Sequence, residues 1–298
     1  MAGLVLALAL AAAATPPDHV HQFHDVVVSP KGDLIAAVEA DDPLKSEADP
    51  HPVVVIRNRA DGAIVGQYDP CKTCFYSGAA WSPDGASLVF VSSDRKAKTA
   101  TLQIVRGGQA EQALAFPGLL DTPRWSPDGQ TLAVLATERP RKIGGATQAG
   151  AAIVGEIGTA TDEQRVAVLP ASGGPLKFLS PDDTYVYEYD WTPDGKAFAV
   201  TAAKGDGDNN WWIAKLAAVG VDGSWRQIAD PGVQMKFPRV SPDGKTVAFI
   251  GGLHSDFGPV GGDLWTVPFA GGQAVDRTPD YKGSFSSLIW RPKTLFAT

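Results

Sequence analysis

The sequence predicts an all-β protein, a β-propeller of four-stranded antiparallel blades with about five complete blades and a partial sixth. A five-residue turn motif recurs at blade spacing, apolar strands flank it, and no segment after the N-terminal apolar run keeps a helical period. Copies occupy residues 28–32, 81–85, 125–129, 191–195 and 240–244, and a shortened copy begins at residue 290. The motif prolines of successive copies are 53, 44, 66, 49 and 50 residues apart, which indicates one sheet per copy.

Each motif has the chemistry of a tight hairpin turn. After its first residue it reads Ser or Thr, Pro, Asp, Gly, with Lys in place of Asp in the first copy. The hydroxyl can bond the turn backbone, Pro presets φ, and Gly supplies the positive φ that closes the turn. Because one carboxylate recurs in each turn, we interpret these aspartates as structural. They are Asp84, Asp128, Asp194 and Asp243.

Strands are expected on both sides of each turn. Residues 87–91, 131–135 and 246–250 are apolar at successive positions, as in strands that are buried on both faces. A second hairpin follows, in which residues 166–169 and 263–269 each lead into a Gly-Gly turn. One unit is therefore four antiparallel strands, and the motif tryptophans are expected to fill the space between neighbouring blades.

The sixth unit contains only its first hairpin, over residues 285–290 and 294–297. Propellers usually close by pairing their first and last blades, because an open sheet edge promotes aggregation. We therefore expect residues 18–24 to donate one strand to this blade. We also expect the propeller domain, residues 15–298, to be truncated at its C-terminal end.

Composition and the N-terminus bear on localisation. The chain has 26 Lys and Arg against 33 Asp and Glu, a net charge of −7, which argues against binding to nucleic acid or anionic lipid. Residues 4–14 form an apolar run that is too short to span a bilayer. Ala12 and Ala14 would occupy positions −3 and −1 of a cleavage site before Thr15, although no Lys or Arg precedes the run. We interpret residues 1–14 as a signal peptide, which predicts a periplasmic or secreted protein.

The two cysteines, Cys71 and Cys74, form a C-x-x-C pair. A four-cysteine zinc site is excluded because no second pair exists, and no βαβ pattern surrounds the pair as in a thioredoxin-like redox site. In an exported chain this arrangement favours a local structural disulfide.

The repeat pattern W-S-P-D-G-x-x-L resembles two groups of propellers. One is the TolB type, and the other is the N-terminal propeller of prolyl-oligopeptidase-family serine peptidases, in the dipeptidyl-aminopeptidase and acylaminoacyl-peptidase branch. The longer stretches D-L-W-T-V-P-F-A-G-G (263–272), D-N-N-W-W-I-A-K (208–215) and K-G-S-F-S-S-L-I-W (282–290) favour the peptidase group.

The resemblance implies a non-catalytic propeller that restricts access of peptides to the serine of a following α/β-hydrolase domain, so that the full-length parent hydrolyses short peptides. The implied partners are that missing hydrolase domain and a peptide substrate, with no cofactor. A catalytic serine would require a G-x-S-x-G nucleophile elbow, which the sequence lacks, so no catalytic residue is assigned. The alternatives are a TolB-like periplasmic protein-interaction propeller and, less favoured, an independent propeller enzyme.

One group of residues is a candidate peptide-binding site. Trp211 and Trp212 are expected to be neighbours on a strand, where adjacent side chains point to opposite faces. One of them would then face the channel or rim beside Glu188 or Asn210 and contact a peptide. The alternative is that both tryptophans pack between blades.

Three further features have structural and functional interpretations. His19, His21 and His24 could bind a metal, but surface or strand-edge histidines are favoured, and we predict no metal site. Residues 206–210 resemble part of a calcium loop but lack its terminal Glu, which favours a hairpin loop. Residues 138–161 are either a flap over a substrate path or an extended hairpin.

Overall fold

The recurring motif forms the turn between the first and second strands of each sheet. The computed structural model describes residues 19–42, 50–140, 162–205, 210–253 and 261–298. In the second copy, Ser82 Oγ donates to Asp84 Oδ1 (2.6 Å) and accepts from the Ser87 amide (2.9 Å). Asp84 Oδ1 also accepts from the amide of Ala86, and Gly85 has φ 73°. The hydroxyl and amide hydrogen bonds lower the pKa of Asp84.

The same hydrogen bonds recur around Asp128, Asp194 and Asp243. The divergent first copy keeps the geometry with a different residue. Lys31 stands where the other copies have Asp, and Ser29 Oγ instead donates to Asp33 Oδ1 (2.7 Å). In all five full copies a carboxylate therefore accepts from the turn hydroxyl, and the chain supplies it from either of two positions.

Five sheets have four antiparallel strands in chain order, and the sixth has two. Blade 1 contains β1 (Val20–Val28), β2 (Leu34–Asp42), β3 (Val53–Asn58) and β4 (Ile64–Tyr68). Blade 2 contains β5 (Phe75–Trp81), β6 (Ser87–Asp94), β7 (Thr99–Arg106) and β8 (Gln109–Phe116). Blade 3 contains β9 (Gly118–Trp125), β10 (Thr131–Glu138), β11 (Arg165–Pro170) and β12 (Lys177–Phe178).

The second half of the chain repeats this order. Blade 4 contains β13 (Thr184–Trp191), β14 (Ala197–Lys204), β15 (Lys215–Gly220) and β16 (Trp225–Ala229), with the 3₁₀ turn η2 (Trp211–Ile213) before β15. Blade 5 contains β17 (Gln234–Val240), β18 (Thr246–Gly252), β19 (Asp263–Pro268) and β20 (Val275–Asp276). Blade 6 contains β21 (Leu288–Arg291) and β22 (Thr294–Ala297). Within the described ranges, no helix is long and apolar enough to cross a bilayer.

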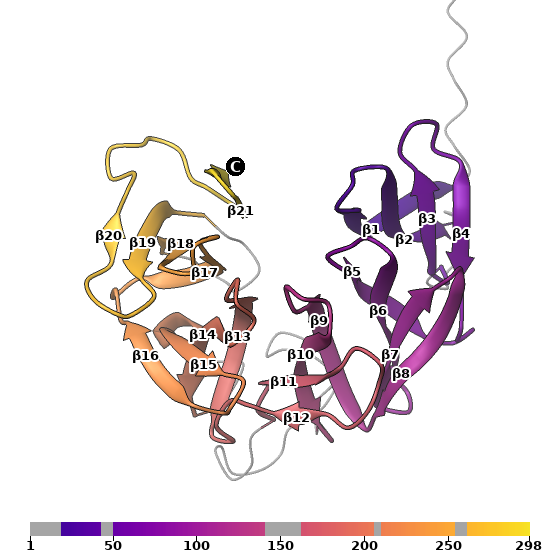
Figure 1. Cartoon of the computed structure of the whole chain (residues 1–298), viewed down its shortest axis with the longest axis horizontal. Coiled ribbons are helices and arrows are strands. Elements are labelled where there is room, and N and C mark those ends of the chain that lie inside the picture. The colour runs from indigo at the N-terminus through magenta and orange to yellow at the C-terminus, as the bar shows by residue number, and fades with distance from the viewer. Residues whose placement is uncertain (1–18, 43–49, 141–161, 206–209, 254–260) are drawn as a thin grey trace, which may run out of the picture.

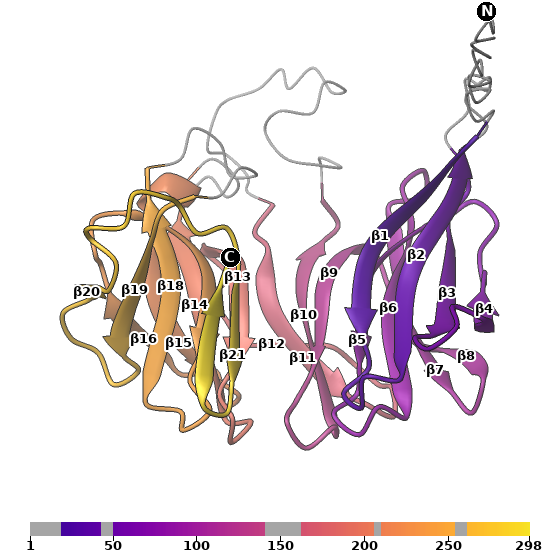
Figure 2. The same cartoon turned by 90° about the horizontal axis from the view of Figure 1, so that it is seen from above.

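The blades stand side by side around a central axis, which confirms the predicted propeller of five complete blades and a partial sixth. Figure 1 shows a C-shaped ring with its opening between blade 1 and the β21–β22 hairpin. Figure 2, at right angles, shows the sheets standing next to one another around the ring. The signal-peptide segment, 1–14, and residues 141–161 and 206–209 of the two candidate loops lie outside the described residues.

Apolar layers fill the spaces between successive blades. The central strands of blades 2 to 5 contribute side chains to both of their faces, as the uninterrupted apolar runs predict. The tryptophans of the second, third and fourth motif copies lie in these layers, and each of these three indole N–H groups donates to a carbonyl of the preceding blade. The pairs are Trp81 with Val27 (3.3 Å), Trp125 with Ala80 (3.0 Å) and Trp191 with Arg124 (3.4 Å).

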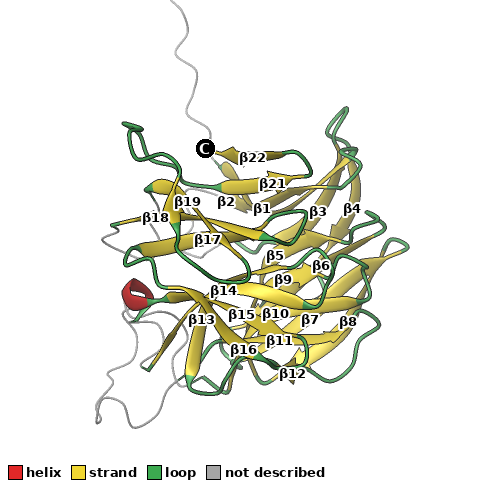
Figure 3. Cartoon of the chain, turned by 60° about the vertical axis from the view of Figure 1, so that its left-hand side comes forward, coloured by secondary structure: helices red, strands yellow, loops and turns green. Residues whose placement is uncertain are grey.

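The expected contribution of residues 18–24 to the sixth blade is wrong. Residues 20–28 form β1, which pairs with β2 in blade 1 from Val20↔Asp42 to Val28↔Ile35. The physical reason is local, because the 28–32 turn fixes an antiparallel hairpin and its register extends back through residue 20. Figure 3 shows β21 and β22 as a separate two-stranded sheet.

Candidate functional site

The first strands of the blades line the inner side of the ring (Figure 1). Each complete blade has a register irregularity in this strand. At each irregularity, one residue lies five positions before the motif proline. Those residues are Asp25, Gly78, Thr122, Glu188 and Phe237. All except Glu188 have a positive φ, with values of 50°, 66°, 47° and 55° in that order. This conformation is rare for β-branched and aromatic residues, so the surrounding fold must enforce it.

Carboxylates bind the amides of these bulges. Asp25 Oδ2 accepts from the amide of Gly78 in the next blade (2.8 Å), and Glu188 Oε2 accepts from that of Phe237 in the next blade (2.8 Å). Asp121 Oδ1 accepts from the amide of its neighbour Thr122 (2.6 Å). The N–H of a bulged residue has no hydrogen-bond partner in the neighbouring strand, and the carboxylate supplies one.

A second set of charges lies three residues before the motif proline in blades 3, 4 and 5. Arg124 Nη1 pairs with Asp190 Oδ1 across the seam between blades 3 and 4 (2.7 Å). The other oxygen, Asp190 Oδ2, accepts from the Val240 amide of blade 5 (2.8 Å). Arg239 follows in blade 5, where its Nε donates to the Leu288 carbonyl of blade 6 (3.2 Å). Charges of alternating sign thus connect blade 3 to blade 5.

Tyr189 packs against the Arg124 side chain and hydrogen-bonds to blade 3. Its ring is fully buried and lies under the Arg124 guanidinium, 5.2 Å from the ring centre. Its hydroxyl lies 2.5 Å from the Thr122 carbonyl and 2.9 Å from that of Ala133. Burial strongly raises the pKa of Tyr189, so the phenol stays neutral.

Burial changes the proton affinity of several groups on the inner strands. It raises the pKa of Glu188 and of Asp121, and it lowers the pKa of Lys236. It also lowers the pKa of Arg239, with a further contribution from the nearby Arg124 charge. We call Asp121, Arg124, Glu188, Asp190, Lys236 and Arg239 the axial cluster. Groups of both signs whose pKa values are shifted and that lie near one another are typical of binding sites.

The predicted peptide-binding residues divide into two places. Glu188 belongs to the axial cluster, whereas Asn210, Trp211 and Trp212 lie at the start of η2, the turn shown in red in Figure 3. The expected strand conformation of the two tryptophans is wrong, because β15 begins only at Lys215. Asn210 donates its side-chain amide to the Lys204 carbonyl (2.9 Å), which favours a turn over an extended strand here.

The two tryptophans differ in exposure. Trp211 packs with Tyr187, Ala203 and Ala214 in a small apolar cluster, while Trp212 is 57% exposed. Tyr187 precedes Glu188 in β13, so the cluster lies next to the inner strand of blade 4. The role of these residues in binding stays a proposal.

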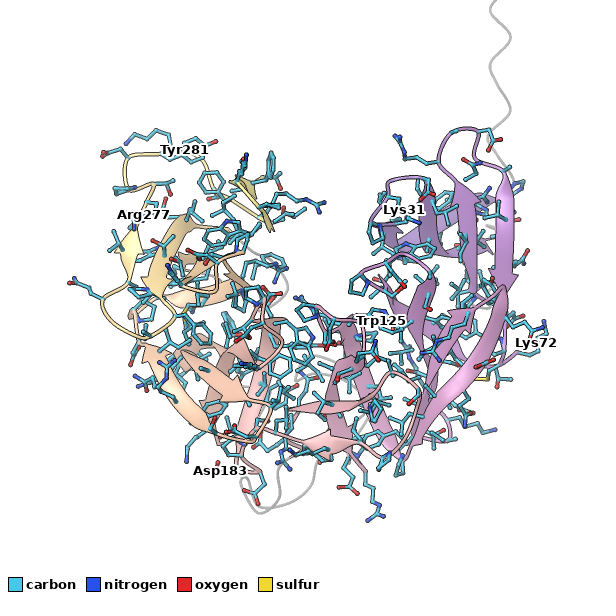
Figure 4. The ribbon with its side chains drawn as sticks, in the orientation of Figure 1. Lys31, Lys72, Trp125, Asp183, Arg277 and Tyr281 are labelled. Carbon is cyan, nitrogen blue, oxygen red and sulfur yellow. A yellow bond between two sulfur atoms is a disulfide. The ribbon has the colours of Figure 1, made fainter. Side chains whose placement is uncertain are left out.

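The C-x-x-C pair lies in the connection between blades 1 and 2. Cys71 and Cys74 form a disulfide. Asp69 lies beside this loop, where burial alone would raise its pKa, but hydrogen bonds from Lys72, His51 and Tyr76 outweigh burial and lower it to about 2. Figure 4 places Lys72 on the outer side of the ring and Trp125 on the inner side, so this loop is remote from the axial cluster.

The three N-terminal histidines do not converge. His21 Nε2 lies 3.0 Å from Glu39 Oε2, and His24 Nε2 lies 3.5 Å from Gln22 Oε1. In the described part of the chain, no three His, Cys, Asp or Glu side chains are grouped as metal ligands.

Most of the axial cluster was not predicted from the sequence. Aligning the repeats on the motif proline reveals the signal, because the residues three positions before it are Val27, Ala80, Arg124, Asp190, Arg239 and Ile289. Charge appears at this position only in blades 3 to 5. An apolar position that becomes charged in consecutive repeats indicates a polar surface at one place in the ring.

No family model and no curated protein matches the chain. Solved structures share its fold. The putative TolB from Agrobacterium tumefaciens is 18% identical, with a TM-score of 0.60 over 93% of this chain and 89% of that one. The β-propeller domain of the Trilobed protease from Pyrococcus furiosus is 11% identical, with a TM-score of 0.61 over 93% and 78%. Acylaminoacyl peptidase from Pyrococcus horikoshii is 14% identical, with a TM-score of 0.61 over 93% and 43%.

These neighbours include both groups of propellers that the sequence resembles. At such identities the likeness shows the fold alone. The chain spans less than half of the acylaminoacyl peptidase and 36% of a similar prolyl endopeptidase, and 56% of TolB from Acinetobacter baumannii.

Proposed function

We propose that this propeller binds extended peptide segments at the axial cluster and acts as the non-catalytic gate of a secreted serine peptidase of the prolyl-oligopeptidase type. Its partner is then an α/β-hydrolase domain that performs the hydrolysis. The axial cluster is the observation that carries this proposal. It places donors and acceptors of both signs on the inner strands, where a peptide that passes along the axis would meet them.

The chemistry of the cluster suits a polypeptide main chain. An extended peptide presents amide N–H groups and carbonyl oxygens, and its ends carry opposite charges. Glu188 and Asp190 can accept from peptide donors, while Arg124 and Arg239 can donate to carbonyls or carboxylates. Because Arg124 and Asp190 are partly buried, hydrogen bonds to them are stronger than they are in water.

Two further observations support the proposal. The neighbours in structure include a peptidase and a protease propeller. The Cys71–Cys74 disulfide suits an oxidising compartment such as the periplasm or the exterior of the cell.

A comparison of unfolded and folded ligands tests the proposal. The probes are ribonuclease A that has been reduced and carbamidomethylated, and native ribonuclease A. A gate binds the unfolded form and excludes the native one. Asp190→Asn should weaken this binding, whereas Asp230→Asn, which removes the outer Lys215–Asp230 pair, should not. Failure to bind either form, or equal loss in the two variants, would contradict the proposal.

A TolB-like interaction module is the second candidate, because the chain matches 89% of the length of the Agrobacterium tumefaciens protein. This function predicts binding to a folded partner and no preference for unfolded ribonuclease A. Both candidates are non-catalytic. We therefore expect no serine of the chain to react with a fluorophosphonate probe, and specific labelling of one serine would overturn both.

A further inference from the structure

We infer that Arg239 binds a carboxylate group of the peptide, an inference that rests on the proposed function. The contacts of Arg239 are the first step. Its Nε donates to the Leu288 carbonyl (3.2 Å) and its Nη1 to the Pro238 carbonyl (2.9 Å), and the guanidinium lies 5.6 Å from the ring centre of Phe237. All of these partners are neutral. Among the described residues, no carboxylate pairs with Arg239 within ion-pair distance.

The neighbouring acids already have partners. Asp190 gives one oxygen to Arg124 and the other to the Val240 amide. Glu188 accepts from the Phe237 amide. The next blade offers no acid at the equivalent position, because residue 289 is Ile. The alternating charges of blades 3 to 5 therefore end on a cation.

An unpaired cation in a desolvated place is costly, and the environment of Arg239 shows that cost. Burial and the repulsion of Arg124 lower its pKa, and the attraction of the nearby Asp190 and Glu188 carboxylates offsets this only in part. The guanidinium remains charged. The side chain is nevertheless partly exposed, so a ligand can reach it. A bound anion would remove the penalty, which makes this position more favourable for an anion than an exposed arginine would be.

The chemistry of the site selects a carboxylate. Nη2 has no protein partner among the contacts of the described residues, and a planar guanidinium binds carboxylates through paired hydrogen bonds. In a peptide, the carboxylate is either the free C-terminus or the side chain of Asp or Glu. Both sources present the same group to Arg239, and only binding experiments separate them.

The test uses three N-acetylated pentapeptides and isothermal titration calorimetry at low ionic strength. The first is pentaalanine with a free carboxylate, the second is its C-terminal amide, and the third is Ala-Ala-Glu-Ala-Ala amide. We expect the first or the third to bind at least about tenfold more tightly than the second, as for a charge-assisted hydrogen bond. The tighter of the two identifies the source of the carboxylate.

Variants connect this preference to Arg239. Arg239→Gln should abolish it, and Arg239→Lys, which keeps the charge but loses the planar fork, should keep part of it. Arg226→Gln is the matched control, because Arg226 also donates to two carbonyls and lies 5.6 Å from a ring centre, that of Phe269, but at the outer strands. This control should retain the full preference.

The outcomes separate the two proposals. Equal binding of acid and amide by the parent protein, or a preference that survives Arg239→Gln, overturns the carboxylate site and leaves peptide binding intact. Binding of none of the peptides overturns the proposed function and this inference together. Thermal unfolding shows whether Arg239→Gln is folded. If Arg239→Gln does not fold, the two other variants decide. The assignment of the carboxylate site to Arg239 is overturned if Arg226→Gln loses the preference for the peptide carboxylate, or if Arg239→Lys keeps that preference in full.

Discussion

The contact between two successive blades, which we call a seam, is built from the same repeat throughout the ring. The residues at the axis nevertheless differ between the seams that join blades 1, 2 and 3 and those that join blades 3, 4 and 5. In the first two seams, the residues three positions before the motif proline are the apolar Val27 and Ala80. Their carbonyls accept indole hydrogen bonds, as the Arg124 carbonyl also does in the third seam. In the next two seams, Arg124 and Asp190 occupy this position. The packing layer is kept while the axial residues change from apolar to charged. We call the seams between blades 1, 2 and 3 the scaffold half, and those between blades 3, 4 and 5, where we propose the binding site, the binding half.

The seam between blades 4 and 5 shows how this change is accommodated. Val240 replaces the motif tryptophan, so no indole N–H reaches back to blade 4. The Asp190 carboxylate instead accepts from the Val240 main-chain amide. An interblade hydrogen bond is retained, but now it depends on a charged group that also faces the axis.

The largest expected effect comes from the scaffold half. Trp125→Ala removes an indole that is only 9% exposed and that fills the layer between blades 2 and 3. We expect a loss of about 3–5 kcal/mol in unfolding free energy, measured by denaturant titration. Trp212→Ala is the control, since that side chain is 57% exposed, and it should cost much less. Similar losses in both would contradict the role of the motif tryptophans.

The next effect tests close packing at the axis. Gly78 has φ 66°, and a Cβ there would lie 2.5 Å from Cδ of Pro123 in the next blade. Gly78→Ala should therefore cost about 2–4 kcal/mol, from backbone strain plus the clash. Gly108→Ala, at φ 79° with no atom within 4 Å, measures the strain alone and should cost about 1–2 kcal/mol. Denaturant titration measures the unfolding free energy of both variants. An equal loss in Gly78→Ala and Gly108→Ala would show that the clash with Pro123 is absent.

A smaller effect is expected in the binding half. Asp190→Asn removes the partner of Arg124 but leaves an amide oxygen that can accept from Val240. We expect a cost of about 1–2 kcal/mol, because both charged side chains are partly buried, at 28% and 21% exposed. Asp230→Asn, whose pair with Lys215 is nearly half exposed, should cost under about 0.5 kcal/mol by the same assay. Equal costs would mean that the axial pair is no more than a surface contact.

The sequence predicts the scaffold half far better than the binding half. The turn motif determines hairpin geometry locally, so the blades, their number and the role of Asp84 and its equivalents follow from spacing and turn chemistry. The prediction that residues 18–24 join blade 6 is wrong because the local hairpin register of the 28–32 turn outweighs ring closure. Contacts of the axial cluster join residues 49 to 66 positions apart, from Glu188 with Phe237 to Arg124 with Asp190, so they depend on blade packing.

The smallest effect is a pH dependence that arises from a buried carboxylate in the binding half. Burial raises the pKa of Glu188, although Lys236, Arg239 and Arg124 lie near enough to oppose the shift. Between the ordinary and the raised pKa, the folded state holds a proton that the unfolded state has lost, so stability falls as pH rises through that interval. Below the ordinary value of 4.5 both states are protonated and the cost is absent.

Glu188→Gln should remove this fall. The amide oxygen can still accept from Phe237, so the variant should match the parent at pH 4 and equal or exceed it at pH 7, as measured by thermal unfolding across that range. The measured quantity is the difference in stability between the parent protein and Glu188→Gln. If this difference is the same at pH 4 and at pH 7, the Glu188 carboxylate is hydrated in the folded state. The burial inferred for the axial side chains of blades 3 to 5 would then be wrong. The two halves of the ring would differ in sequence but not in environment.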